Sequence, residues 1–546
     1  MNNKTTFLLL IVCLIFAASL RIFTFSNTDH LDFESVFRIM DSYGRVQNPF
    51  VFLNTTQVIT SGTGGQRGYY FLNSLLMSIF DNPVIVSKIT SLLFGLLSII
   101  PYYLLVKLAF SKEIALASVF ALAFYSVHIQ LSAVAMANTG SIFFIILSLY
   151  FLLKYLYFDS GQNSKYSILT SALFCLLATS FRMETWLFIP LATLIIKGEK
   201  KYLAAVIFFC LSSIYILNTL YLFNFSLDFL NNPIFHLNVA KLPSPVFNLL
   251  VTRPNILGQG DYQIFVWIHT LFHTLSLPLT ICGFLGALLA FKNKKQRIFC
   301  LFFLSFFTLS TVRQIISNHQ PFIRYSCILV IFFLPLIFLS IQKITTYLSL
   351  IFKLKKASRK IILRISLCAS LLFFISFSTN LLSADIPQMQ YDATAHALNN
   401  WAKRHLKSGD YIICGFSSLY LSGAATENSF TTYAIDYPLL FNIYDFLSAE
   451  DISKLDLNEK SSEQINIFEK KYQSLLKEKN LSHWLIIKRA SQRNIKRIVL
   501  MLSNDDYIYI RRNFPNLLKK FKIKFNRLMY FGFLETTTLD VDESIF

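Results

Sequence analysis

Nine apolar runs, each close to the length of a membrane crossing, constrain this chain more than any other feature. A helix needs about 20 apolar residues to cross the hydrocarbon core of a bilayer. The runs cover residues 7–25, 84–110, 114–131, 142–156, 202–222, 264–291, 298–316, 323–341 and 361–382. Of the 546 residues, 54% are hydrophobic and 15% are charged, a composition that excludes an ordinary soluble protein. The sequence therefore predicts a mainly α, polytopic membrane protein.

Lysine and arginine gather in the short connections between these runs, at Lys112, Lys154, Lys165, Lys197, Lys200, Lys201, 292–297 and 343–364. Such loops are cytoplasmic by the positive-inside rule. This placement also accounts for the net charge of +20 without nucleic acid as a partner. The apolar stretch 167–196 has cytoplasmic flanks, so we expect a hairpin with short arms that turns outside around Arg182-Met-Glu184.

With this hairpin, about eleven crossings leave the N-terminus in the cytoplasm and the C-terminal region outside the plasma or inner membrane. Without it, the C-terminal region would lie inside. The first run carries Ala17-Ala-Ser19, which resembles a signal-peptide cleavage site. Because its apolar character continues to Phe25, we expect a retained anchor.

The composition changes after residue 382. We expect a transmembrane domain at 1–382, with an acidic first outer loop at 26–83, and a small extracytoplasmic α/β domain at 383–546. In the second domain the pattern predicts helices at 391–407 and 461–479 and strands at 411–414 and 483–488. The basic stretch 343–360 is either an ordinary cytoplasmic loop or a helix on an anionic inner leaflet.

Several carboxylates follow the first run directly, in the segment TDHLDFESVFRIMDS at 28–42. If the segment is helical, Glu34 can pair with Arg38 four residues later, as a surface ion pair. Asp32 has no cation at helical spacing, and Asp29 precedes it by three residues. These two acids either cap a helix or act in catalysis.

Four arginines are expected on the same outer face as these acids: Arg67, Arg182, Arg253 and Arg324. Charges within membrane depth are costly and often mark a substrate site. A carboxylate that faces arginines suits a reaction in which the acid deprotonates a hydroxyl and the cations stabilise a departing phosphate.

The order of these features resembles the GT-C superfamily of integral-membrane glycosyltransferases, which use polyprenyl-phosphate sugars. That group includes protein mannosyltransferases (glycosyltransferase family 39), aminoarabinose transferases and oligosaccharyltransferase catalytic subunits. The resemblance rests on the acidic first outer loop and on GYYFLNSLLMSIF, TSFRMETWLFIPLA and HQPFIRYSCILVIFFLPL, followed by a soluble outer domain. It covers most of the chain.

The resemblance implies roles for individual residues. Asp32 matches the first-loop carboxylate, with Asp29 and Glu34 as neighbours, although many relatives have adjacent Asp-Glu where this chain reads Asp32-Phe-Glu34. Arg182 and Glu184 match an Arg-x-Glu turn, and Arg324 matches an Arg-Tyr before a late helix. His128, Asn138 and Arg67 are further candidates for substrate binding, with packing as the alternative for the first two. His319 is a weaker candidate.

The implied reaction is the inverting transfer of a hexose or pentose from the lipid donor to a hydroxyl on a cell-envelope lipid, glycan or protein. We assign no cofactor, and a divalent metal stays an open alternative. Two other functions compete: a transporter or flippase of lipid-linked saccharides, and a polymerase or ligase of them. A transporter should have repeats and broken helices with polar residues near the midplane, and neither is evident in the sequence.

Overall fold

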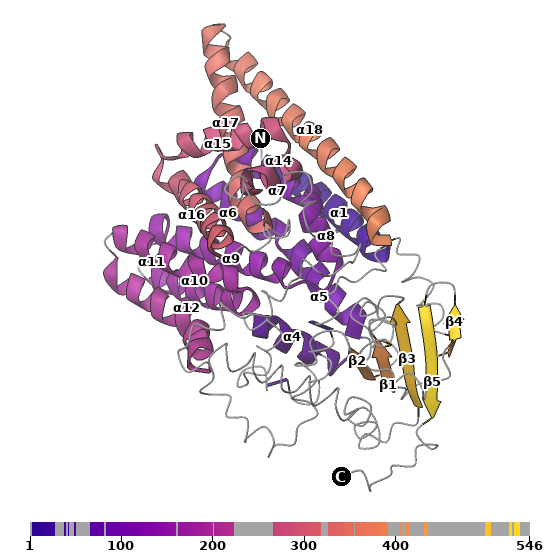
Figure 1. Ribbon diagram of the computed structural model, residues 1–546. Coiled ribbons are helices and arrows are strands. Elements are labelled where there is room, and N and C mark those ends of the chain that lie inside the picture. Colours follow the sequence, from indigo (N-terminus) through magenta and orange to yellow (C-terminus); the bar gives the residue numbers. More distant parts are fainter. Residues whose placement is uncertain are drawn as a thin grey trace.

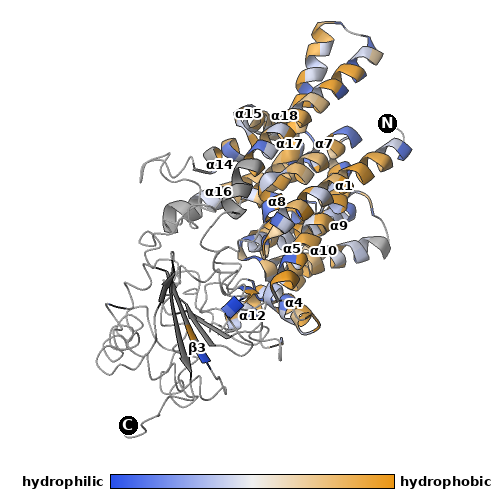
Figure 2. Cartoon of the chain, turned by 90° about the vertical axis from the view of Figure 1, so that its right-hand side faces the viewer, coloured by the Kyte–Doolittle hydropathy of each residue, from blue (hydrophilic) through white to orange (hydrophobic). Residues whose placement is uncertain are grey.

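The computed structural model describes residues 3–27, 38–39, 42, 49–50, 66–80, 83–159, 162–199, 201–222, 266–317, 326–353, 355–390, 404–405, 411–414, 431–434, 497–503, 511, 524–526 and 529–535. Figure 1 shows a bundle of helices with a small sheet beyond one end. In both this view and the rotated view of Figure 2, the N-terminal end of the first helix lies away from the sheet.

The helices of the first half are α1 (Asn3–Asn27), α4 (Arg67–Met77), α5 (Pro83–Leu97), α6 (Ile99–Ala109), α7 (Lys112–Phe124), α8 (Ser126–Ala133), α9 (Asn138–Tyr157), α10 (Gln162–Phe181), the 3₁₀ turn η2 (Met183–Leu187), α11 (Phe188–Gly198) and α12 (Tyr202–Leu222). Those that follow are α14 (Val266–Leu275), α15 (Leu277–Ala290), α16 (Lys294–Ser317), α17 (Ser326–Ile351) and α18 (Lys356–Gln390).

Seven helical segments of the described chain are long and apolar enough to cross a membrane, or eight if the bent pair α7–α8 is one crossing. Their outer faces are apolar, as Figure 2 and the exposed Phe7, Leu203 and Leu372 illustrate. The prediction of a mainly α, integral membrane protein is thereby confirmed. The count of about eleven crossings stays a prediction.

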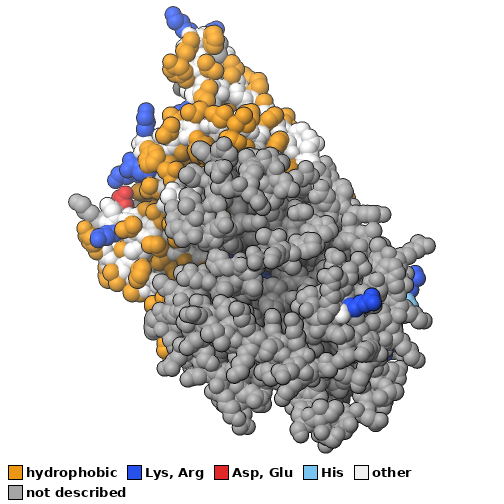
Figure 3. Space-filling view, viewed as in Figure 1, with side chains coloured by type: hydrophobic (Ala, Val, Ile, Leu, Met, Phe, Trp, Pro, Cys, Tyr) orange, Lys and Arg blue, Asp and Glu red, His pale blue; other side chains and the backbone are white. Residues whose placement is uncertain are grey.

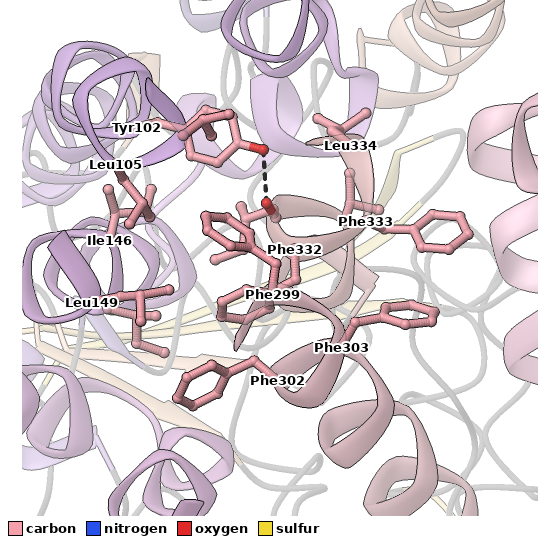
Figure 4. Packing of buried hydrophobic residues seen from close by; sticks show 14 of the residues in the cluster. Tyr102, Leu105, Ile146, Leu149, Phe299, Phe302, Phe303, Phe332, Phe333 and Leu334 are labelled. Atoms are coloured by element: carbon pink, nitrogen blue, oxygen red, sulfur yellow. Dashed lines mark hydrogen bonds between the residues drawn. The ribbon is translucent and has the colours of Figure 1, made fainter. Parts of the chain in front are cut away.

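Aromatic side chains fill the centre of the bundle, where α16 and α17 meet (Figure 4). The ring centroids of Phe303 and Phe333 lie 4.5 Å apart, and those of Phe302 and Phe332 lie 5.4 Å apart. Tyr102 of α6 donates its hydroxyl to the carbonyl of Ile331 at 2.7 Å. This bond ties the first half of the chain to the second.

The predicted hairpin at 167–196 is present as α10, η2 and α11. Both of its ends lie beside the C-terminal end of α9: Ser167 donates to Asp159, and Lys201 donates to the carbonyl of Tyr155 at 3.0 Å. Since α11 has 11 residues and rises about 16 Å, the returning arm is short, as expected. The expectation of a short first arm was wrong, because α10 has 20 residues and is long enough to cross a membrane.

The basic stretch 343–360 is neither a loop nor a separate surface helix. Instead, α17 continues through Lys343 to Ile351, and α18 begins at Lys356. A turn at Phe352 and Lys353 joins them, and Lys353 has a left-handed φ of 51°. No glycine or proline lies between residues 343 and 360, so nothing in the sequence interrupts either helix within the basic stretch. Figure 3 shows the resulting tip, with lysine and arginine among hydrophobic side chains.

Five strands form one sheet in the order β2-β1-β3-β5-β4: β1 (Tyr411–Cys414), β2 (Thr431–Ala434), β3 (Arg497–Ser503), β4 (Lys524–Asn526) and β5 (Met529–Glu535). The pairs β1–β2 and β1–β3 are parallel, and β5 is antiparallel to both β3 and β4. The predicted strand 411–414 is confirmed. The other predicted strand, 483–488, and the helix 461–479 lie outside the described residues, as does most of the helix 391–407.

Candidate functional site

The described residues include part of the predicted site. Asp29, Asp32, Glu34, Arg253, His319 and Arg324 lie outside them. Arg67, His128, Asn138, Arg182 and Glu184 lie within them, and so does Arg38. The described residues therefore make up the cationic side of the predicted site.

Arg182 and Glu184 form a two-pronged ion pair at the turn between α10 and α11. Arg182 follows the last residue of α10 in an extended conformation, with φ −148° and ψ 130°, and η2 begins at the next residue. Its Nε and Nη2 donate to Glu184 Oε2 and Oε1 at 2.9 and 2.8 Å. Its Nη1 donates to Asn138 Oδ1 at 3.3 Å, at the start of α9. The guanidinium is buried and Glu184 is partly exposed.

Arg67 begins α4 and is fully buried. Its guanidinium lies 4.8 Å from the ring centroid of Tyr215 on α12. It donates from Nε to the Tyr215 hydroxyl at 3.2 Å and from Nη2 to Thr219 Oγ1. Within the described part of the chain its Nη1 is buried without a hydrogen-bond partner. Two of the three nitrogens are thus fixed, and the third has no partner among the described residues.

Arg38 lies deeper than a surface ion pair would place it. The sequence offered such a pair with Glu34 as one possibility, but Arg38 is fully buried, and Glu34 lies outside the described residues. Its Nε donates to Gln66 Oε1 at 2.7 Å, and its Nη1 contacts Met136 Sδ. A charge is held inside because the segments just before α4 and α9 supply polar atoms.

Short links along the chain bring Arg38, Arg67 and Arg182 into one region, which we call the arginine cluster. Arg38 contacts Gln66, the neighbour of Arg67, and Met136, two residues before the Asn138 that binds Arg182. Gly68, next to Arg67, packs so closely on α10 that a Cβ atom there would overlap Ser180 Oγ. The start of α4, the start of α9 and the end of α10 therefore converge.

The charge of the arginine cluster favours an anion. Arginine stays protonated in proteins and only donates hydrogen bonds. Glu184 balances Arg182, whereas the described contacts of Arg67 are with neutral groups. Buried cations beside neutral partners bind phosphate or carboxylate oxygens strongly, and the forked guanidinium suits phosphate.

His128 lies elsewhere, at the bend between α7 and α8. Arg21, fully buried in α1, donates to its Nδ1 at 2.7 Å and to the carbonyl of Ala123 at 2.9 Å. These described contacts give His128 a packing function, and its role in substrate binding stays a prediction. Sequence reasoning missed Arg21, although an arginine inside an apolar run is itself a signal.

Within the described ranges, no group of three or more His, Cys, Asp or Glu side chains could hold a metal ion. The acidic first loop, which carries the predicted carboxylates, lies outside those ranges.

The sequence model of one protein family, described as dolichyl-phosphate-mannose-protein mannosyltransferase, matches residues 68–222. These residues span α5–α12 and almost all of α4, with Arg182 and the partners of Arg67 among them. No curated protein sequence matches the chain.

Solved structures have a similar fold over most of this chain at low sequence identity. ArnT from Cupriavidus metallidurans in the apo state has a TM-score of 0.58 at 10% identity, covering 95% of this chain and 97% of its own. The same protein bound to undecaprenyl phosphate gives 0.56 at 10% identity, covering 98% of both chains. Oligosaccharyltransferase AglB from Archaeoglobus fulgidus, in complex with an inhibitory peptide and a dolichol-phosphate, gives 0.52 at 12% identity, covering 95% of this chain and 72% of its own.

Proposed function

We propose that this chain, which has the fold of the GT-C superfamily of membrane glycosyltransferases, moves a sugar from a polyprenyl-phosphate donor to an acceptor hydroxyl on the outer face of the membrane. The observation that carries the proposal is the arginine cluster, with three buried guanidinium groups and an Arg67 Nη1 that lacks a described hydrogen-bond partner. Two structures with this fold hold undecaprenyl phosphate and a dolichol-phosphate, which are ligands of the same chemical class.

In the proposed reaction the acceptor oxygen attacks the anomeric carbon while the bond from that carbon to the phosphate oxygen breaks. Asp32 takes the acceptor proton, with Asp29 and Glu34 as the neighbouring carboxylates. Arg67, Arg182 and Arg324 hold the phosphate, whose negative charge grows as the sugar leaves. Because phosphate is a good leaving group, orientation and charge stabilisation supply most of the rate.

The orientation that we propose has the N-terminus in the cytoplasm and the domain 383–546 outside. Two features support it. The hairpin of α10 and α11 returns the chain to the lysine-rich side, where Lys201 contacts the end of α9. The sheet lies beyond the opposite end of the bundle from the N-terminus (Figure 1).

A transporter of lipid-linked saccharides is the second candidate, and one observation favours it. The sequence shows no broken helix, yet α7 and α8 form a span bent by 51° at Tyr125, with Arg21 and His128 buried beside the break. The expectation that broken helices are absent was therefore wrong. No described contact joins this break to the arginine cluster, so we rank transfer first.

The test uses a strain that lacks the gene, complemented with wild type, Asp32→Asn, Arg67→Gln or the control Arg297→Gln at matched membrane levels. Arg297 is an exposed arginine that contacts the carbonyl of Phe291. Mass spectrometry of cell-envelope glycans should find one sugar restored by wild type and Arg297→Gln only. Restoration by all four would exclude the assigned site, and lipid-linked sugar that accumulates on the inner face would favour the transporter.

A further inference from the structure

Helix α4 carries several buried polar atoms that bond to nothing in the described chain: Arg67 Nη1, both amide atoms of Asn73, and Ser74 Oγ. Ser87 Oγ on α5 is also buried without a hydrogen-bond partner in the described chain. All four side chains are fully buried. Buried polar groups are nearly always hydrogen-bonded, because leaving them unsatisfied costs free energy. Such a concentration on one 11-residue helix indicates groups that a ligand completes.

The helical repeat arranges these atoms along α4. Ser74 follows Arg67 by seven residues, which is two turns and about 10 Å along the same face. Tyr69 contacts Ser91 of α5 through their hydroxyl oxygens, 3.2 Å apart. Asn73 lies one turn after Tyr69 and Ser87 lies one turn before Ser91, so both lie nearer the short connection between the two helices.

The chemistry of the group matches a phosphorylated sugar. One guanidinium with an available nitrogen suits a phosphate oxygen. The amide of Asn73 and the hydroxyls of Ser74 and Ser87 both donate and accept, as sugar hydroxyls do. A purely ionic ligand would leave the amide unsatisfied, and an apolar one would leave all four side chains unsatisfied.

We infer that α4 and the start of α5 form the subsite for the sugar of the donor. Arg67 contacts the phosphate, while Asn73, Ser74 and Ser87 hydrogen-bond the sugar hydroxyls and so select the sugar. This inference rests on the proposed function, because it assumes a polyprenyl-phosphate donor. It differs from that proposal in assigning sugar recognition to uncharged groups away from the acidic loop.

The test compares binding of lipids with and without a sugar. Wild type and variants in nanodiscs are titrated with undecaprenyl phosphate and with undecaprenyl phosphates that carry mannose, glucose or N-acetylglucosamine. Asn73→Leu should weaken binding of the preferred sugar-bearing lipid by about ten- to a hundredfold, which corresponds to the loss of two neutral hydrogen bonds. It should leave binding of the sugar-free lipid unchanged, whereas Arg67→Gln should weaken binding of both lipids.

Two smaller substitutions test the subsite with less risk of misfolding, and a third serves as a matched control. Ser74→Ala and Ser87→Ala should each weaken binding of the sugar-bearing lipid alone, by about three- to tenfold. Ser98 is also a buried serine, but its hydroxyl already donates to the Gly95 carbonyl at 2.8 Å. Ser98→Ala should therefore leave the binding of both lipids unchanged.

The outcomes separate this inference from the proposed function. If wild type binds undecaprenyl phosphate but Asn73→Leu, Ser74→Ala and Ser87→Ala bind the sugar-bearing lipids as wild type does, the subsite is wrong and the donor class stands. A rise in thermal stability of Asn73→Leu with unchanged binding would show that the buried groups hold only water. If wild type binds none of these lipids, both proposals fail.

Discussion

Arg182 depends on the shape of its guanidinium group as much as on its charge. Three of its nitrogens reach Glu184 and Asn138 at 2.8–3.3 Å, so one side chain joins the turn after α10 to the start of α9. Lysine would keep the charge, but a single ammonium cannot reproduce this fork.

Arg182→Lys should therefore lower sugar transfer by at least about tenfold, through misplacement of the phosphate contacts rather than through unfolding. Transfer is measured in membranes with matched protein levels, and thermal unfolding is followed in detergent. The control Arg297→Lys changes an exposed arginine and should retain activity. Full activity in Arg182→Lys would remove this residue from the site.

Single residues could be identified from the sequence when their partners are near in the chain. Arg182 and Glu184 are two positions apart, and the expected turn is where they pair. Arg38 could not be placed, because burial comes from Gln66 and from Met136, which is 98 positions away. Nothing in the local pattern around Arg38 distinguishes a surface pair from a buried contact.

Two glycines allow α15 to lie directly against α17. A Cβ atom at Gly286 would overlap the backbone carbonyl of Leu336, and one at Gly283 would overlap the ring of Phe333. Membrane helices lack a hydrophobic force between them, so close approach through small residues stabilises their contact.

Gly286→Ala should destabilise the protein by about 1–3 kcal/mol, because the backbone of α17 cannot rotate away as a side chain can. Thermal unfolding in detergent measures the loss. Gly198→Ala is the matched control, since a Cβ there meets nothing within 4 Å. Equal midpoints for the two variants would mean that α15 and α17 are not packed this closely.

The sequence predicted whole helices where apolar runs are long, but it did not predict where these helices break. The run 114–131 contains no Gly or Pro, yet it bends at Tyr125. Distant groups stabilise this break: Arg21 binds the carbonyls of Leu122 and Ala123, and Ser378 of α18 binds the carbonyl of Phe124. Because the caps come from α1 and α18, the local sequence contains no signal for them.

At the scale of the molecule, the length of α18 decides how far the protein extends beyond the bilayer. Its 35 residues rise about 52 Å, against a hydrocarbon core of about 30 Å. The tip shared with α17 is basic and carries exposed Tyr347 and Phe352. Such a composition suits the interface of an anionic leaflet.

In a background without native cysteines, Phe352→Cys should react with a membrane-impermeant thiol reagent in inverted vesicles only. Arg511→Cys, at another exposed position, should react in intact spheroplasts only. These outcomes follow from a cytoplasmic tip and an external C-terminal domain. If both cysteines react from the same side, the hairpin of α10 and α11 does not cross as proposed.

The sequence predicted the membrane bundle and one strand of the sheet, but not the order of the strands. Strand β1 lies between β2 and β3, and 82 residues separate the end of β1 from the start of β3. Parallel neighbours need long crossovers, and their pairing depends on contacts that no local pattern specifies.

The contacts of Arg21 also impose an order on assembly. This arginine lies on α1, whereas its acceptor at Ala123 comes 102 positions later in the chain. Until α7 has been synthesised, the charge of Arg21 lacks this partner and must stay near water or lipid headgroups. Helix α1 therefore reaches its final position only when α7 and α8 arrive beside it.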